Sequence, residues 1–449
     1  MIHDSRIQIL HDAQQSGGEF VLYWMQAAQR SRYNHALEYA IRAANARNLP
    51  VVAFFGLTWQ YPEANQRHYR FMIDGLKTVQ KRLADKGILL AIQTVSPEEG
   101  ALSLSERAAL VVVDRGYLHL QKQWRQSLAG RIQCPLIQVE SEVIVPVETA
   151  MGKEAYSAAV LRRKIKTHLD DYLVALRETR PKKSALDISV DSLDARGIEQ
   201  QFTAAALDAS VPPVADFPGG PAAAEKRLSR FIRKQLADYN TLRNDPSVNL
   251  QSDMSPYLHF GQISPLYIAR QVMAAAAHAA EAYLEQLIVR RELSMNFAFY
   301  NPDYATFAGL PAWAKKTLAE HGADARDYCY RLETLESANT HDPYWNAAQN
   351  ELRLCGKIHG YMRMYWGKKI LEWSQTPETA FSRSLYLNNR YALDGRDPNS
   401  YAGILWCFGK HDRPWPERPI FGKVRYMNDR GLKRKFNVDA YVEKINRLG

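Results

Sequence analysis

The distribution of hydrophobic residues divides the chain into two unlike halves. In the first half, apolar runs of strand length alternate with stretches whose apolar residues keep helical spacing, such as 33–47 and 66–86. The runs lie at 19–25, 50–57, 88–95, 109–114 and 136–146. This order predicts a parallel, Rossmann-like sheet with helices on both faces. The turn after the first run reads MQAAQRSRYN, without G-x-G-x-x-G, so binding of a dinucleotide pyrophosphate is not supported.

The second half is predicted to be all helical. A basic amphipathic helix is expected at 155–176, and the stretch 178–222 is rich in Pro, Ser, Asp and Gly, which is typical of a linker. Beyond it the apolar spacing is helical almost to the end of the chain. We therefore expect an α/β domain at 1–177, an interdomain linker at 178–222 and an all-α domain at 223–449.

One predicted helix carries unusual residues. The segment LCGKIHGYMRMYWGKKILEW, residues 354–373, places Trp366 and Trp373 two turns apart on nearly the same face. Core packing is the common reason for such a face. Gly356 and Gly360 indicate close helix contact or close approach of a flat ligand, because glycine costs about 1 kcal/mol against alanine in a helix interior.

A possible ion pair joins this helix to the segment that follows it. The stretch 387–406 places Asn388, Asp394 and Asp397 in a loop or at helix ends, where such side chains act as caps. If Arg363 pairs with Asp394 inside the domain, both ions need further hydrogen bonds, such as a bound heteroaromatic would provide. A solvated surface ion pair is the alternative.

Composition narrows the class of protein. The chain has 449 residues, 46% of them hydrophobic and 24% charged, and no run of eighteen apolar residues, so we expect a soluble intracellular protein without a membrane span. The four cysteines are scattered, which predicts neither a metal site nor a disulfide framework. The net charge is +10, and residues 410–449 hold eleven basic against five acidic side chains with aromatics between them. Solubility is one explanation, and a nucleic-acid partner is the other.

Long motifs then resemble one known family. SPYLHFGQIS (255–264), THDPYWNAAQ (340–349), LNNRYALDGRDPNSYAG (387–403) and ERPIFGKVRYMNDRGLKRKF (417–436), with YWMQAAQRSRYN near the N-terminus, are similar to the class II cyclobutane pyrimidine dimer photolyases of the photolyase/cryptochrome family. The resemblance covers nearly the whole chain. It implies a helical domain that binds FAD, with FADH⁻ as the active form, and repair of dimers in double-stranded DNA by light-driven electron transfer.

The resemblance also implies roles for residues of the flavin site. Trp366, Trp345 and Trp373 resemble the chain that reduces oxidised flavin, and Asn388 resembles the residue that faces flavin N5. Arg363 and Asp394 resemble the pair at the isoalloxazine. Further cofactor contacts are implied for Tyr239, Arg243, Ser252, Ser255 and Asp397.

On the DNA side, Trp406 resembles the aromatic that packs on the dimer, and Arg413, Trp415 and Arg425 resemble residues that contact the strand or fill the gap it leaves. Gln286 stands where many relatives have a glutamate that hydrogen-bonds the dimer; an amide can donate a hydrogen bond but not a proton. The family leaves open an antenna pigment, for example of the deazaflavin type, in the N-terminal domain. We further expect a monomer in the cytoplasm, associated with the nucleoid if the source is prokaryotic.

Three other functions remain to be weighed. A cryptochrome-like photosensor would share the fold and the flavin without repair, and Gln286 favours it, whereas Asn388 fits repair. A nucleotide-handling enzyme suggested by the α/β half alone does not explain the helical half. A (6-4) photolyase is disfavoured because the motifs are of the class II type.

Overall fold

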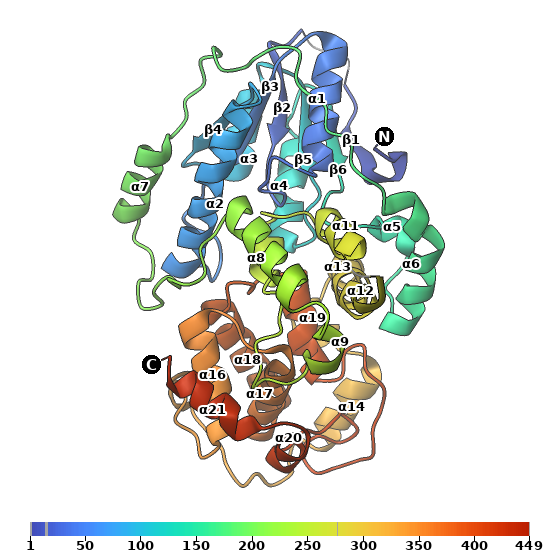
Figure 1. The fold of residues 1–449 in the computed structure, drawn as a ribbon, viewed down its shortest axis with the longest axis vertical. Coiled ribbons are helices and arrows are strands. Elements are labelled where there is room, and N and C mark those ends of the chain that lie inside the picture. The colour runs from blue at the N-terminus through green and yellow to red at the C-terminus, as the bar shows by residue number, and fades with distance from the viewer. Residues whose placement is uncertain (1, 14–16, 276, 449) are drawn as a thin grey trace.

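The computed structural model describes residues 2–13, 17–275 and 277–448. An α/β region, formed by the N-terminal part of the chain, lies at one end of the long axis of the molecule, and a helical region lies at the other end (Figure 1). The predicted fold class, an α/β domain followed by an all-α domain, is confirmed.

The α/β region contains one sheet of six strands in the order β1-β6-β5-β2-β3-β4. All neighbouring strands are parallel except β1, which runs antiparallel to β6. Strands β2, β3 and β5 are buried along their whole length, which explains their unbroken apolar runs. The strands are β1 (Ile7–His11), β2 (Phe20–Trp24), β3 (Val51–Gly56), β4 (Leu89–Gln93), β5 (Ala108–Asp114) and β6 (Leu136–Val139).

Helices cover both faces of this sheet. Helices α1 (His35–Arg47) and α2 (Gln66–Ala84) pack on the face that carries Val21 and Tyr23. Helices α3 (Pro97–Ser105) and α4 (His119–Ala129) pack on the opposite face, with Phe20 and Leu22. The sheet is therefore doubly covered, and its carboxyl edge points toward the helical region (Figure 1).

The rest of the chain is helical. A short α5 (Val147–Ala150) and the basic α6 (Ala158–Tyr172) lie beside the helical region. Its members are α8 (Pro221–Lys234), α9 (Tyr239–Leu242), α10 (Ser255–His259), α11 (Pro265–Ala275), α12 (Ala277–Leu284), α13 (Arg291–Tyr300), α14 (Ala312–Glu320), α15 (Leu332–Glu336), α16 (Pro343–Cys355), α17 (Gly360–Glu372), α18 (Pro377–Tyr391), α19 (Pro398–Cys407), α20 (Asp429–Lys435) and α21 (Val438–Asn446). A π-helical segment, Glu285–Arg290, joins α12 to α13.

Two details of the first half differ from the sequence prediction. Strand β1 lacks an apolar run because it lies at the sheet edge with most of its side chains partly or fully exposed. The expected linker 178–222 contains a helix, α7 (Ala195–Ala204), whose Ile198 and Phe202 are buried in the core beside α2. Glu199 of α7 also pairs with Arg70 and Lys77 of α2. Two buried apolar residues are too weak a pattern for the sequence to predict this helix.

The prediction of one helix over 354–373 is wrong. Helix α16 ends at Cys355, Gly356 adopts a left-handed conformation with φ 66°, and α17 begins at Gly360. Gly356 is thus a helix C-cap, the position where glycine is favoured because it has no Cβ. A Cβ on Gly360 would meet no atom within 4 Å, so that glycine marks no close contact. A Cβ on Gly356 would come within 3.0 Å of Leu393, and one on Gly367 within 2.6 Å of Cys407 Sγ, so close contacts occur at these two glycines.

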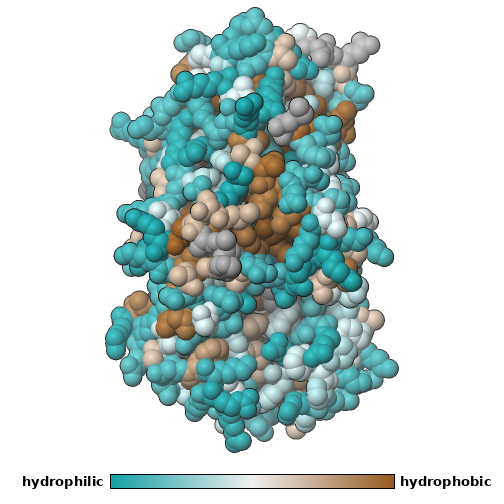
Figure 2. Space-filling model, turned by 45° about the vertical axis from the view of Figure 1, so that its right-hand side comes forward, coloured by the Kyte–Doolittle hydropathy of each residue, from teal (hydrophilic) through white to brown (hydrophobic). Residues whose placement is uncertain are grey.

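Hydrophilic side chains cover most of the face shown in Figure 2, and an apolar area lies near its middle. Among the described residues, no helix is long and apolar enough to cross a membrane.

Candidate functional site

A cleft in the helical region brings together residues from four distant segments. They come from the start of α9, from 252–258, from the end of α12 with the π-helical segment and the start of α13, and from 394–399. The lining residues are Tyr239, Ser252, Met254, Ser255, Leu258, Tyr283, Gln286, Leu287, Arg291, Asp394, Asp397 and Asn399. Six of the predicted site residues, Tyr239, Ser252, Ser255, Gln286, Asp394 and Asp397, therefore line one cleft.

The charged pair predicted from the sequence is present at this cleft. Arg363 Nη2 lies 3.2 Å from Asp394 Oδ1, and the two side chains are 18% and 10% exposed, so the surface alternative is wrong. Burial opposes ionisation of Asp394, but Arg363 and Ser255 outweigh it and hold the pKa of that carboxyl below its usual value. Asp394 is thus an anion that can accept a hydrogen bond from an N–H of a ligand.

Asp397 fixes the opposite end of the same turn. Its Oδ1 accepts a hydrogen bond from Asn399 N at 2.8 Å, which caps α19, and its Oδ2 lies 3.2 Å from His259 Nδ1. Since Ser255 bonds Asp394 and His259 bonds Asp397, α10 holds both ends of the turn 394–397.

Hydroxyl groups gather at another part of the cleft. Tyr283 Oη donates to Ser252 Oγ at 3.1 Å, and the rings of Tyr283 and Tyr239 meet edge to face at 5.3 Å. Burial raises the pKa of Tyr239, so its phenol stays protonated and able to donate. Neutral hydroxyls of this kind suit phosphate and ribose oxygens.

Gln286 lies in the π-helical segment. Such segments contain one residue more per turn than an α-helix and often occur at functional sites. Here the segment turns Gln286 and Leu287 toward the cleft, whereas Glu285 on the same segment pairs with Arg162 of α6.

Besides Arg363, which reaches the cleft only through its pair with Asp394, two predicted cofactor residues lie outside the cleft lining. Arg243 lines a neighbouring groove between α6 and α12 and has its guanidinium 6.0 Å from the Tyr239 ring. Asn388 is buried in the last turn of α18, where its amide bonds Ser400 Oγ and contacts Asn389 Oδ1 at 3.4 Å. Asn388 thus lies behind the residues that line the cleft.

The three predicted tryptophans form one buried cluster of contacting rings. Trp366 and Trp345 lie parallel with ring centroids 6.4 Å apart, and Trp345 meets Trp373 at 5.6 Å. Each indole of the parallel pair donates a hydrogen bond, Trp345 to the Trp366 carbonyl and Trp366 to Gln349 Oε1. The contacts therefore run Trp366–Trp345–Trp373, with the residue from α16 between Trp366 of α17 and Trp373, the C-cap of α17.

The four predicted DNA residues also gather. The Arg425 guanidinium lies 5.7 Å from the Trp406 ring and 4.9 Å from the Trp415 ring, and Arg413 lies 5.3 Å from Trp415. Behind Trp406, the buried Lys368 Nζ sits 5.3 Å from its ring and donates to the Cys407 carbonyl at 2.5 Å. Burial lowers the pKa of Lys368 to about 8.

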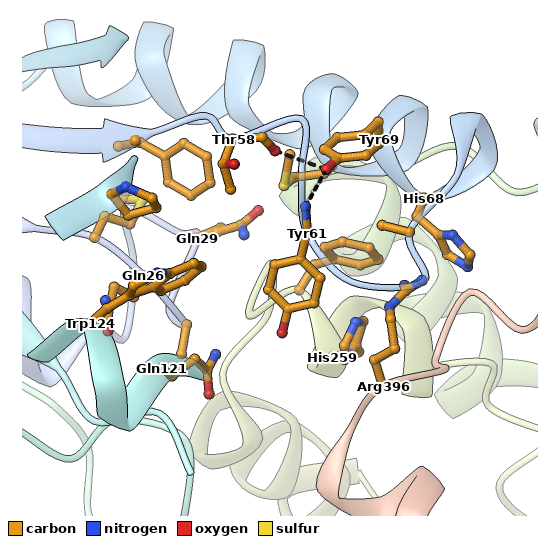
Figure 3. A pocket seen from close by; sticks show the side chains of 18 residues that line it. Gln26, Gln29, Thr58, Tyr61, His68, Tyr69, Gln121, Trp124, His259 and Arg396 are labelled. Carbon is orange, nitrogen blue, oxygen red and sulfur yellow. Dashed lines mark hydrogen bonds between the residues drawn. The ribbon is translucent and has the colours of Figure 1, made fainter. Parts of the chain in front are cut away.

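A second pocket lies between the sheet edge and the helical region (Figure 3). It is reached by residues that follow β2 and β3 and by residues of α2 and α4, where ligands of open α/β sheets bind. Asp114 at the end of β5 accepts hydrogen bonds from Gln26 N and Ala28 N, which fixes the turn after β2. Figure 3 shows that Gln29, Tyr61 and Trp124 come from different elements and point toward the same space.

The polar groups of this pocket are incompletely paired. Among the described residues, the buried Gln26 Nε2 and Gln29 Oε1 have no hydrogen-bond partner. One is a donor and the other an acceptor, so a flat ligand with N–H and C=O edges would satisfy both. Burial raises the pKa of Tyr61 to about 12, and its ring meets Trp124 at 6.2 Å.

The wall between the two pockets is thin. His259 and Arg396 line the second pocket, whereas Asp394 and Asp397 line the cleft. Arg396 has a positive φ of 61°, a conformation that side chains rarely adopt, and it is held by Asn389 Oδ1, which accepts from its N–H at 3.0 Å. The turn 394–397 therefore presents Asp394 and Asp397 to the cleft and Arg396 to the second pocket.

Several lining residues were not singled out from the sequence. Asn399 follows Asp397 and Pro398, a sequence typical of a helix start, and that signal could have placed it at the cleft. Tyr283 and Arg291 carried no distinguishing signal. Gln26 and Gln29 follow the first strand, and their place at the carboxyl edge of a parallel sheet could have marked them. Among the described residues, no group of three or more His, Cys, Asp or Glu could hold a metal ion.

By sequence, the chain matches both a family model and individual known proteins. A family model described as DNA photolyase matches residues 21–183. A protein of Methanothermobacter thermautotrophicus named deoxyribodipyrimidine photo-lyase is 52% identical over 449 residues, which cover 100% of this chain and 99% of the relative.

Solved structures share the fold at low identity. A photolyase of Sulfolobus tokodaii, solved with two FAD molecules, superposes with a TM-score of 0.72 at 16% identity and covers 94% of this chain and 89% of its own. A cryptochrome of Synechocystis sp. PCC6803 superposes with a TM-score of 0.71 at 14% identity, covering 96% and 89%. The fold alone thus occurs in both a photolyase and a cryptochrome.

Proposed function

The chain belongs to the DNA photolyase family, and from that premise we propose that it repairs cyclobutane pyrimidine dimers in DNA with light and a reduced FAD. The observation that carries the proposal is the cleft, because it brings the Arg363–Asp394 pair close to Gln286. The same protein also brings Trp406, Arg425 and Trp415 together. The ion pair would bind the flavin, the amide of Gln286 would bind the lesion, and the aromatic cluster would bind the DNA strand.

The donor set of the cleft fits FAD. Tyr239, Ser252 and Ser255 would hold phosphate and ribose oxygens, and Arg363 with Asp394 would hold the C=O and N–H edges of the isoalloxazine. Bound in reduced form, FAD supplies the electron that light transfers to the dimer. Asn388 would act close to the ring, held in place by Ser400.

Gln286 stands where the dimer would enter the cleft. Its amide would donate to a dimer carbonyl and stabilise the negative charge that the added electron creates, as an oxyanion-hole donor does. This role needs an N–H but no transferable proton, so the replacement of glutamate by Gln286 is compatible with repair.

The arginine and tryptophan cluster would hold the strand. A dimer must leave the duplex, which costs a few kcal/mol, and Trp406 offers it a flat partner in the pocket. Arg425 packs against both Trp406 and Trp415, so it can fill the space that the dimer leaves and meet phosphates. Reduced FAD as the active form and the monomeric state belong to the same proposal.

The second pocket is proposed to hold an antenna pigment of the deazaflavin type. The unpaired Gln26 Nε2 and Gln29 Oε1 support this, because a flat heteroaromatic with polar edges would satisfy both groups. Trp124 and Tyr61 would supply apolar and aromatic contact area.

A binding experiment separates repair from a cryptochrome-like photosensor. The protein should bind a dimer-containing duplex more tightly than an undamaged one, and the affinity should fall steeply with salt because phosphates are contacted. Arg425→Ala should lose about 1 to 3 kcal/mol of that affinity. Equal affinity for damaged and undamaged duplexes, at every salt concentration, would favour the photosensor.

A further inference from the structure

Aromatic contacts continue beyond Trp373 toward the protein surface. Tyr330 meets Trp373 edge to face with ring centroids 5.4 Å apart, and His341 meets it at 5.2 Å. Tyr330 N donates to the Trp373 carbonyl at 3.2 Å, which ties the two residues together. Beyond them, Tyr328 stacks on His341 at 3.7 Å and is 46% exposed.

Tyr330 and His341 share a short hydrogen bond. Tyr330 Oη lies 2.6 Å from His341 Nδ1, and the backbone N–H of His341 donates to the same Oη at 3.1 Å. In the His341 tautomer that carries its hydrogen on Nε2, the phenol O–H donates to Nδ1 while the backbone N–H uses an acceptor site of the phenol oxygen. The His341 side chain is otherwise exposed to solvent.

A cation also lies close to the Trp373 ring. Lys369 Nζ is 5.6 Å from the Trp373 ring and pairs with Glu372 Oε2 at 2.7 Å. A positive charge at this distance opposes an oxidised, positively charged indole, and Glu372 offsets that effect only in part. Tyr330 can instead be oxidised without gaining charge, provided that its proton leaves.

We propose that His341 is the proton acceptor for oxidation of Tyr330 by Trp373. The inference rests on the tryptophan path of the proposed function, in which photoexcited oxidised flavin takes an electron from Trp366. One electron passes from Tyr330 to the oxidised indole of Trp373, the O–H bond of Tyr330 breaks, and the proton bonds to His341 Nδ1. The products are a neutral indole, a neutral phenoxyl radical and an imidazolium.

The surroundings complete the cycle. The imidazolium faces solvent and releases a proton to water, and a thiol reductant in solution returns one electron to the phenoxyl radical. Loss of the proton hinders return of the electron from the flavin along the tryptophans to Tyr330, so Tyr330 and His341 lengthen the life of the charge-separated state.

The test compares variants of the full-length, flavin-loaded protein by transient absorption and electron paramagnetic resonance. His341→Gln keeps an acceptor for the phenol hydrogen bond but cannot take its proton. We expect the Tyr330 radical to form more slowly by roughly 10²-fold or more, the range in which a positioned base contributes, and the oxidised tryptophan to persist correspondingly longer. The solvent deuterium isotope effect of the step should also change.

Two controls identify the groups. Tyr328→Phe keeps the ring stacked on His341 and should leave rate and yield unchanged, whereas Tyr330→Phe should remove the tyrosyl signal. His341→Gly with imidazole added to the solution should regain the fast phase, which a merely structural role of His341 would not allow.

A soluble photo-excited ruthenium oxidant, used on the same variants, makes the result independent of the flavin. If the flavin reduces without light-driven oxidation of Trp366, the tryptophan path of the proposed function is wrong, but slower formation of the Tyr330 radical with the ruthenium oxidant in His341→Gln still supports the inference. Equal rates in His341→Gln and the parent, with either oxidant, would overturn it.

Discussion

The cleft and the second pocket share a wall but satisfy their polar groups in different ways. In the cleft, Asp394 and Asp397 are bonded by Arg363, Ser255 and His259, so the site holds its shape by itself. In the second pocket, the amides of Gln26 and Gln29 each have an atom without a partner among the described residues. The difference indicates a preorganised site in the helical region and, beside the sheet, a site that needs its ligand to be complete.

The largest effect should come from breaking the ion pair of the cleft. Asp394→Ala leaves Arg363 buried without an anion, which typically costs about 3 to 5 kcal/mol. We expect a lower free energy of unfolding in urea and purified protein with little flavin. The exposed Asp216→Ala is the matched control and should change neither quantity; retention of full stability by Asp394→Ala would mean that the cleft is not held by this pair.

The next largest effect should come from replacing Gln286, whose amide lies on the π-helical segment. Gln286→Leu removes a hydrogen-bond donor without filling much new space, and loss of one such donor costs about 2.7 to 4 kcal/mol of stabilisation. The repair yield per absorbed photon should fall strongly while flavin content stays normal, and Gln286→Glu should change the yield only modestly. Undiminished repair by Gln286→Leu would make Gln286 a packing residue.

A pH titration tests the buried Lys368, which lies behind Trp406. Its pKa is lowered by burial to about 8, so above that value the folded protein loses a proton that the unfolded chain keeps up to the ordinary lysine range. Stability should therefore rise with pH: relative to Lys368→Met, the parent should gain roughly 2 to 3 kcal/mol between about pH 7 and pH 10. Parallel stability curves for the two proteins would show that Lys368 titrates normally.

The smallest effect should come from the second pocket. Gln29→Leu removes a buried acceptor that has no partner, and such groups cost about 1 to 3 kcal/mol each. The pigment-free variant should be more stable by up to that amount and should no longer bind a deazaflavin, measured by absorption after reconstitution. Gln133→Leu, at an exposed site, is the control. Normal pigment binding by Gln29→Leu would assign the ligand to another place.

The sequence could predict the elements that have a regular apolar pattern and the site residues that lie in long motifs. The buried strands β2, β3 and β5 and the helices α1 and α2 were predictable because their apolar spacing is regular over many residues. Ser255, Asp394 and Asp397 could be predicted to share a site because they lie in the long motifs 255–264 and 387–403. The break between α16 and α17 was missed because apolar spacing continues across it, although Gly356 is a typical C-cap residue.

Other features depend on contacts that the sequence does not encode locally. Helix α7 is docked by the buried Ile198 and Phe202 and by Glu199, which pairs with Arg70 and Lys77 of α2. Strand β1 is specified by its neighbour β6 rather than by an apolar run. The order Trp366–Trp345–Trp373 could not be read from spacing, because the middle residue comes from a different helix. The second pocket has no motif, since its polar lining residues come from segments far apart in the sequence, such as Gln26, Gln121 and His259.

Repair itself is the most direct test of the account. The protein, with its flavin chemically reduced, is mixed with an oligonucleotide duplex that contains one thymine dimer, and intact thymines are measured after illumination and in the dark. We predict restoration in blue light only, proportional to absorbed photons, and none when the flavin is kept oxidised without a reductant. No restoration by fully reduced, illuminated protein would contradict the account and leave the photosensor in its place.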